Sequence, residues 1–173
     1  MAENCGADLV RYDFSIQRTS GFDVAFSPQI NNLPVGVQAS FSRTTYTSEQ
    51  TRGYFTLQGL RDILPLDYDL FFSIVLTSES DEFPFVLKQR DENLNPPKLV
   101  VPLDNAISQN IDLQFEWEDD NNVDSSRLQV SLTDNFNSFV QDTLLTQNFF
   151  SMNSLEPATT YYWRVQNRNI CNE

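Results

Sequence analysis

Apolar side chains recur at every second position over most of this chain, and this period of two limits its possible folds more than any other feature. Residues 10–16 alternate apolar with polar or charged side chains, and residues 113–117 repeat the same pattern in the second half. Such alternation is typical of half-buried β-strands, whereas amphipathic helices repeat their apolar positions every three or four residues. Helical spacing is nearly absent, apart from room for one turn within residues 58–64. The sequence therefore predicts an all-β protein.

The alternating segments fall into two series, each long enough for a small sandwich. Short strands at intervals of roughly ten residues, without helices between them, favour antiparallel β-sandwiches. In the first half we expect strands near residues 10–16, 22–26, 37–41, 53–57, 68–76 and 83–87. In the second half we expect strands near residues 99–101, 113–117, 128–132, 139–142, 149–152 and 161–165. The predicted fold class is two tandem antiparallel β-sandwiches.

A polar segment that ends in two prolines separates the two series. Residues 88–95 are charged or polar, and Pro96 and Pro97 follow them. Two adjacent prolines cannot both take part in a strand ladder, and proline stiffens the backbone because its φ is fixed. We therefore predict a first domain at 1–92, a linker at 93–97 and a second domain at 98–173, held in line by a stiff joint.

Both predicted sandwiches have an end that the sequence does not complete. Residues 167–173 are polar and too few for a turn followed by a strand, so the second sandwich is expected to lack its last strand. The strand over 161–165 would then have an exposed edge, open to strand pairing or weak self-association. Either the chain is cut from a larger protein, or the edge is open for a partner. For the first sandwich, one alternative is that its first strand lies upstream of Met1.

Composition and charge exclude several functional classes. Acidic residues number 24 against 11 basic ones, for a net charge of −13, which argues against binding duplex DNA or an anionic membrane. Histidine is absent, which excludes Ser-His-Asp catalysis and histidine-ligated zinc. The sequence contains neither a Gly-x-Ser-x-Gly elbow nor a glycine-rich phosphate loop, and no apolar run is long enough to span a bilayer. We predict a protein that is not an enzyme, has no cofactor and inserts into no membrane.

The two cysteines lie near opposite ends of the chain. Cys5 and Cys171 could form a bridge only if the termini met, because a disulfide holds its two Cα atoms within ~4.4–6.8 Å. Two free thiols are the preferred interpretation, and the bridge remains the alternative.

An acidic loop after residue 117 is the main candidate for a metal site. Calcium prefers six to eight oxygen ligands from carboxylates, amides and carbonyls, and this loop is rich in all three. The candidate ligands are Glu118, Asp119, Asp120 and Asp124. The competing and favoured interpretation is a solvated acidic loop that keeps the protein soluble.

Aromatic side chains offer a second candidate site, a platform for carbohydrate. Strand parity leaves some of them facing outward, and sugars can stack on such rings. The candidates are Tyr46, Tyr54, Tyr68, Phe71, Phe72 and Tyr162. The alternative for Phe71 and Phe72 is core packing in a buried strand, and for Tyr162 it is cross-strand packing on an outer face.

The second half resembles a fibronectin type III domain. The run Leu155-x-Pro157-x-Thr-x-Tyr161, followed by Trp163, is similar to the E–F corner and strand F of that family. The resemblance implies that Tyr161 is the tyrosine corner, whose hydroxyl ties strand F to the preceding loop. It also implies that Trp117 is the core tryptophan of strand B. The same sandwich hosts many unrelated functions, so the resemblance predicts a fold and names no ligand.

The first half resembles an immunoglobulin-like repeat of bacterial secreted proteins. Gly21-Phe22 and the segment Leu33–Ser42 carry this resemblance, and Pro102–Ala106 is similar to fibronectin-like modules of the same proteins. Such modules form cell-surface stalks or follow a catalytic domain, as in secreted zinc metallopeptidases. The resemblance implies a non-catalytic spacer or adhesion module, extracellular or at the cell surface, that presents a neighbouring domain or binds a protein or a surface glycan. Met1–Asn4 carries no export signal, which we then expect in a longer precursor.

Overall fold

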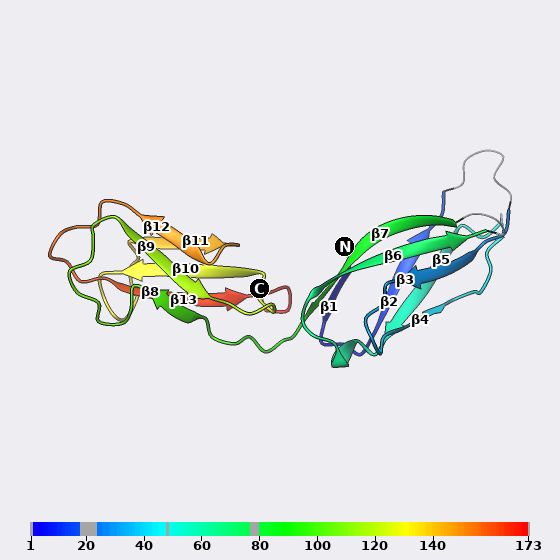
Figure 1. The fold of residues 1–173 in the computed structure, drawn as a ribbon, viewed down its shortest axis with the longest axis horizontal. Helices are drawn as coiled ribbons and strands as arrows, with labels where there is room; N and C mark the ends of the chain where they lie inside the picture. Colours follow the sequence, from blue (N-terminus) through cyan, green and yellow to red (C-terminus); the bar gives the residue numbers. More distant parts are fainter. Residues whose placement is uncertain (1, 18–23, 48, 77–79, 173) are drawn as a thin grey trace. The chain divides into compact units, whose positions relative to one another are not determined.

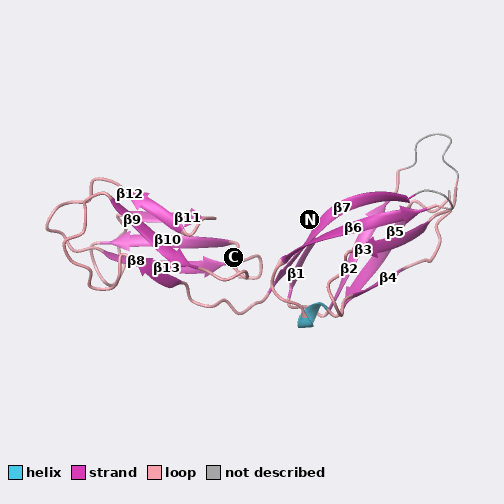
Figure 2. Cartoon of the chain, in the orientation of Figure 1, coloured by secondary structure: helices cyan, strands magenta, loops and turns pink. Residues whose placement is uncertain are grey.

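The computed structural model describes residues 2–17, 24–47, 49–76 and 80–172, and it divides the chain into two compact units. Unit 1 comprises Met1–Arg90 and unit 2 comprises Asp91–Glu173. Strands form the regular structure of the described residues, apart from one 3-10 turn, η1, at Leu60–Asp62 (Figure 2). The predicted all-β fold class, tandem β-sandwiches, is confirmed. No helix among the described residues is long and apolar enough to cross a membrane.

The described residues of unit 1 form seven strands in two sheets, labelled in Figure 1. One sheet has the order β1-β7-β6-β3 and the other has the order β2-β5-β4. This division is that of an immunoglobulin-like sandwich, in which the third, sixth and seventh strands share a sheet opposite the second and fifth. The strands are β1 Ala2–Cys5, β2 Leu9–Ser15, β3 Ser27–Asn31, β4 Gln38–Phe41, β5 Arg52–Gln58, β6 Asp67–Val75 and β7 Ser80–Arg90.

Strand β1 is the element of unit 1 that the sequence analysis missed. The first strand was considered upstream of Met1, but β1 lies at Ala2–Cys5 and pairs in parallel with the end of β7, Cys5 opposite Arg90. Unit 1 is therefore not purely antiparallel. Strand β1 has four residues, which are too few to show the alternation of a longer strand. The strand expected at 22–26 falls partly outside the described residues, as does the Gly21-Phe22 pair, and β3 begins only at Ser27.

Aromatic rings fill the core of unit 1. Phe55 on β5 lies within 5.3–6.1 Å, centroid to centroid, of four other rings, those of Tyr12, Phe41, Phe72 and Phe85. Such ring pairs add to the free energy of burial because their quadrupoles favour tilted contacts. Gly53 makes the close packing possible, since a Cβ there would lie 2.3 Å from the Tyr46 hydroxyl.

Unit 2 contains six strands in two three-stranded sheets. The sheets have the orders β12-β9-β8 and β11-β10-β13, and Phe115, Trp117, Leu128 and Val130 are fully buried between them. The partition is fibronectin type III-like, with six strands among the described residues. The strands are β8 Lys98–Val101, β9 Leu113–Glu118, β10 Ser125–Ser131, β11 Gln141–Leu145, β12 Phe149–Met152 and β13 Tyr162–Arg168.

Candidate functional site: the polar loop end of unit 2

The acidic loop between β9 and β10 is held by the core tryptophan. Trp117 is 1% exposed, and its indole Nε1 donates a hydrogen bond of 2.9 Å to the Asp119 carboxylate. The Ser126 hydroxyl, at the start of β10, lies 3.0 Å from the same carboxylate oxygen. Because buried indole and hydroxyl groups need partners, Asp119 satisfies both at once. Its side chain is thus directed back at the sandwich.

The other three calcium candidates have different partners. Asp120 accepts hydrogen bonds from the Asn122 amide at 2.9 Å and from the Asn95 side chain at 2.7 Å. Asp124 accepts one from the Ile170 amide, and Glu118 pairs with Lys98 at 2.9 Å. In the described part of the chain, no group of three or more acidic or cysteine side chains is arranged to hold a metal ion. The structure therefore does not bring the four candidates together as a calcium site.

Two buried asparagines organise this end of unit 2. The Asn169 side chain donates hydrogen bonds of 2.9 Å to the carbonyls of Asp91 and Asn122, and its own oxygen accepts the Cys171 amide. Asn122 accepts the Asp91 amide at 2.7 Å and donates to the Asp91 and Asn93 carbonyls. A side-chain amide can do this because it carries two donors and an acceptor. We call this pair, Asn122 and Asn169, the asparagine clamp.

The clamp changes the interpretation of the predicted linker. Asp91 and Asn93 are held by the clamp, and the Asn95 carbonyl accepts a hydrogen bond of 3.2 Å from Asn167 on β13. Residues 91–95 are thus hydrogen-bonded into unit 2, which begins at Asp91. The sequence showed a polar segment before two prolines, and its hydrogen-bond partners elsewhere in unit 2 lie between 25 and 80 residues away in the chain, for example Asp120 for Asn95 and Asn172 for Glu92.

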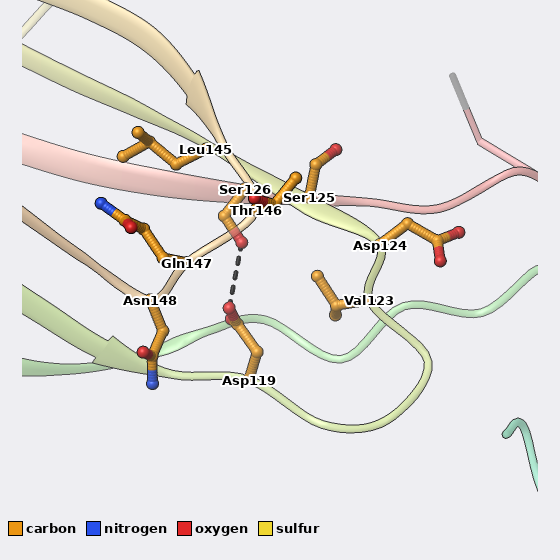
Figure 3. Close-up of a pocket in the computed structure, with 9 residues that line it drawn as sticks. All are labelled: Asp119, Val123, Asp124, Ser125, Ser126, Leu145, Thr146, Gln147 and Asn148. Carbon is orange, nitrogen blue, oxygen red and sulfur yellow. Dashed lines mark hydrogen bonds between the residues drawn. The ribbon is translucent and has the colours of Figure 1, made fainter. Parts of the chain in front are cut away.

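A surface hollow of about 210 Å³ lies beside this network. In Figure 3, the lining residues Ser126 and Asp119 point toward each other and are joined by the hydrogen bond described above. Both groups are already committed to structural bonds, Asp119 to Trp117 and Ser126 to Asn167 as well. The lining residues are Asp119, Val123, Asp124, Ser125, Ser126, Leu145, Thr146, Gln147 and Asn148.

The preference for free thiols is wrong, because both cysteines are disulfide-bonded. Within unit 1, Cys5 ends β1 and pairs with Arg90, the last residue of that unit. Within unit 2, Cys171 follows the clamp residue Asn169, and its neighbour Asn172 donates to the Glu92 carbonyl. Each cysteine therefore lies close to the Arg90–Asp91 peptide in its own unit. Separation in sequence hid this, since β1 and the clamp were both unexpected.

The candidate aromatics do not form one platform. Tyr46 is completely buried, with its hydroxyl 2.7 Å from that of Ser42, and Tyr68 and Phe72 pack against the core of unit 1. Tyr54 lies under the Arg11 guanidinium, 3.8 Å from its ring centroid, and Phe71 is half-buried on β6. Of the six candidates, only Tyr162 is classed as exposed.

The fibronectin-like signature residues lie where strand β13 begins. The Glu156 amide donates a hydrogen bond of 3.0 Å to the Tyr161 hydroxyl, which is the contact that a tyrosine corner makes. Leu155 is buried, and Pro157 lies in the loop that this bond closes. Trp163 contacts Phe115 with ring centroids 5.2 Å apart.

Two electrostatic features stand out from the ordinary surface. On the outer face of unit 2, Arg127 donates two hydrogen bonds, of 2.6 and 2.7 Å, to Asp142, and these lower the pKa of that carboxyl. In unit 1, burial raises the pKa of Tyr12 to about 12, and the Tyr12 hydroxyl is the one buried side-chain polar atom, among the residues described, without a hydrogen-bond partner. Burial also raises the pKa of Tyr68.

Comparisons with known proteins give a distant likeness alone. No protein family matches this sequence, and no curated protein matches it either. Among solved structures, the crystal structure of domains A168–A170 from titin is similar over 99% of this chain, with 11% identity and a TM-score of 0.43. The chain spans about half the length of that titin fragment, since the match covers 56% of it.

Proposed function

We propose that this chain is a non-catalytic accessory module of an exported protein, which presents a neighbouring domain or binds a partner. The observation that supports the proposal is that the carboxylates of the candidate site are already hydrogen-bonded within the protein. Asp119, Asp120 and Asp124 each accept hydrogen bonds from the protein's own side chains or backbone. Groups already fixed in this way stabilise loops, whereas a catalytic acid or base needs its proton site facing a substrate.

Two further features support an extracellular place of action. The cysteines are disulfide-bonded, and disulfides persist mainly in oxidising compartments. The net charge of −13 keeps the molecules apart and soluble. Titration with a thiol reagent tests the first point on protein purified from an oxidising compartment and unfolded without reductant. We expect no reactive thiol per chain, and two reactive thiols would contradict the export proposal.

The non-catalytic role is tested by a panel of chromogenic esters, glycosides and peptides. We expect no turnover above that of buffer. Turnover that persists through repurification and is lost in Asp119→Asn would overturn the proposal. Affinity electrophoresis in soluble polysaccharides addresses the carbohydrate alternative, and retardation that Tyr162→Ala abolishes would replace the protein-partner role with a sugar-binding one.

A further inference from the structure

The loop end of unit 2 opposite the asparagine clamp consists of three loops, 102–112, 132–140 and 153–161. They share one end because β8 runs antiparallel to β9, β9 to β12, and β10 to β13 (Figure 1). The Leu155 amide donates a hydrogen bond of 2.9 Å to the Ile111 carbonyl and so joins two of these loops. We call this region the apolar loop end.

Exposed apolar side chains are concentrated in two of these loops. Among the described residues of unit 2, eleven large apolar side chains are exposed, and six of them lie in the loops 102–112 and 132–140, which hold about a quarter of the unit. The loops at the clamp end, 119–124 and 146–148, are described throughout and expose none. The six are Leu103 (71% exposed), Ile107 (84%), Ile111, Leu132, Phe139 and Val140. Apolar side chains gathered on a surface mark interaction sites, whereas scattered ones need no explanation.

Hydrogen bonds and backbone geometry fix the conformations of these loops. The Ser154 amide donates a hydrogen bond of 3.0 Å to the Asp112 carboxylate. The Ala106 amide donates one of 3.1 Å to the Leu103 carbonyl. The residues other than glycine that have a φ between 53° and 62° in these loops are Asn105, Ser108, Phe136, Ser154 and Ala158. Such left-handed conformations persist only where the surrounding structure holds them, and ordered loops lose less entropy on binding.

The apolar loop end is also negatively charged. Its three loops contain no lysine or arginine, and their acidic residues are Asp104, Asp112, Asp134 and Glu156. None of these four forms an ion pair with a residue that the structure describes. Arg164 contacts the loops at Phe136, 4.2 Å from the ring centroid. The charge of Arg164 acts on Asp142, however, both directly and through Gln129.

We propose that the apolar loop end binds a partner protein whose docking face has apolar side chains surrounded by lysine or arginine. The apolar centre of that face would cover Leu103 and Ile107, and its cations would lie beside the four carboxylates. Apolar burial would give most of the affinity, and charge complementarity would select the partner. This inference names the partner chemistry of the proposed module and rests on that function. Its experiment measures binding, so its failure is distinct from the detection of turnover or of free thiols.

The same charges disfavour the other possible occupants. A second copy docked end to end would bring four more carboxylates against the four already present, and such juxtaposition of like charges is costly. An anionic membrane would repel this end for the same reason.

The probe is a capped nonapeptide of three lysines, three leucines and three lysines, added to the full 173-residue chain. Calorimetry gives the dissociation constant, and amide chemical shifts locate the contact. We expect shift changes in residues 102–112 and 132–140. Residues 119–124 are the internal control, because that loop has carboxylates without exposed apolar side chains. Peptides with serine in place of leucine, or glutamate in place of lysine, should each bind at least roughly tenfold more weakly.

Variants separate this site from general attraction to an acidic chain. Ile107→Ser, at a position 84% exposed, should keep the fold and weaken binding of the lysine–leucine peptide roughly tenfold. Leu144→Ser on β11, 56% exposed, is the matched control and should leave binding unchanged. Asp104→Asn should weaken binding roughly twofold and make it less sensitive to salt, whereas Asp62→Asn in unit 1 should change neither.

Four results would overturn the inference. The first is absence of shift changes in residues 102–112 and 132–140 at millimolar lysine–leucine peptide. The second is equal binding of the leucine and serine peptides, because charge alone would then explain the contact. The third is shift changes in these loops that grow with protein concentration without peptide, which would identify a second copy. The fourth is sedimentation of the chain with phosphatidylcholine vesicles that Ile107→Ser abolishes, which would identify a lipid surface.

Discussion

Units 1 and 2 share a two-layer architecture but cover their sheet edges differently. In unit 1 the edge of β7 is covered by β1, which pairs with it in parallel over Ala2–Cys5. In unit 2 the corresponding edge, β13, has no further strand among the described residues. Alternation of side chains dictates that two layers form, but it does not determine how many strands close each layer. Edge closure is a separate problem, and proteins solve it in several ways.

The two units also differ in what stabilises them. Unit 1 relies on ring contacts centred on Phe55, whereas unit 2 adds to its smaller core the asparagine clamp, Asn122 and Asn169, at one loop end. Apolar burial is roughly proportional to area and tolerates some rearrangement, while a buried polar network is costly when a single member is lost. The comparison predicts different responses to core and polar substitutions.

The largest effect is expected from a matched pair of core truncations. Leu70→Ala on β6 and Leu128→Ala on β10 each remove a completely buried leucine from a central strand. We expect a loss of about 3–4 kcal/mol for Leu70 and about 2–3 kcal/mol for Leu128, since the cost depends on how far the site can relax and unit 2 is open at β13. Amide exchange in β6 reports unit 1, and tryptophan fluorescence reports unit 2, because Trp117 and Trp163 both lie there.

Ser40→Ala on β4, an exposed position, is the control and should change stability by less than about 0.5 kcal/mol. Equal losses for the two leucine variants would remove the argument that the open edge softens unit 2.

The fold follows from the sequence wherever the alternation is long. Strands such as β5, β6, β9 and β13 lie within a few residues of their predicted positions, because each has at least two inward apolar residues in register. Strand β1 escaped because four residues show too little alternation, and its parallel partner lies more than eighty residues away. A pairing between distant short segments leaves no local signal.

At the polar loop end, the sequence shows the acidic residues but does not show their hydrogen-bond partners. Calcium was the less favoured interpretation of those acidic residues, and their oxygens accept hydrogen bonds from the Trp117, Ser126 and Asn95 side chains and from backbone N–H groups. Asparagine gives a weak signal in sequence because it is common in turns. The three asparagines within residues 167–172 were the sequence feature that could have indicated this network. Their partners are known only from the fold, in which β13 lies beside residues 91–95.

The second prediction removes one member of the clamp. Asn169→Ala removes the side-chain partner of the Asn122 carbonyl and of the Cys171 amide at a buried position, and it leaves the Asp91 carbonyl with its bond from Asn122 alone. We expect unit 2 to lose about 2–3 kcal/mol, because an unsatisfied buried group costs its full desolvation penalty. Urea unfolding followed by tryptophan fluorescence measures this.

Asn137→Ala, an exposed position in the β10–β11 loop, is the matched control and should change stability by less than about 0.5 kcal/mol. Amide exchange in β6 should stay unchanged in both variants. A clamp variant as stable as the control would show that water replaces the lost hydrogen bonds, and unit 2 would then depend on its apolar core just as unit 1 does.

The smallest effect, of opposite sign in the two units, comes from removing one hydroxyl. Tyr12→Phe removes a buried hydroxyl without a partner and should stabilise unit 1 by about 1 kcal/mol, while Tyr161→Phe breaks the bond from the Glu156 amide and should destabilise unit 2 by about 1 kcal/mol. The pH dependence gives an independent sign. The pKa of Tyr12 is raised from 10.0 to about 12, so between those values the unfolded chain loses a proton that the folded one keeps. Stability of unit 1 should therefore fall with rising pH across this window, less steeply in Tyr12→Phe. Equal slopes in amide exchange of β6 for wild type and variant would mean that water reaches the Tyr12 hydroxyl, and the core of unit 1 would then be as open as that of unit 2.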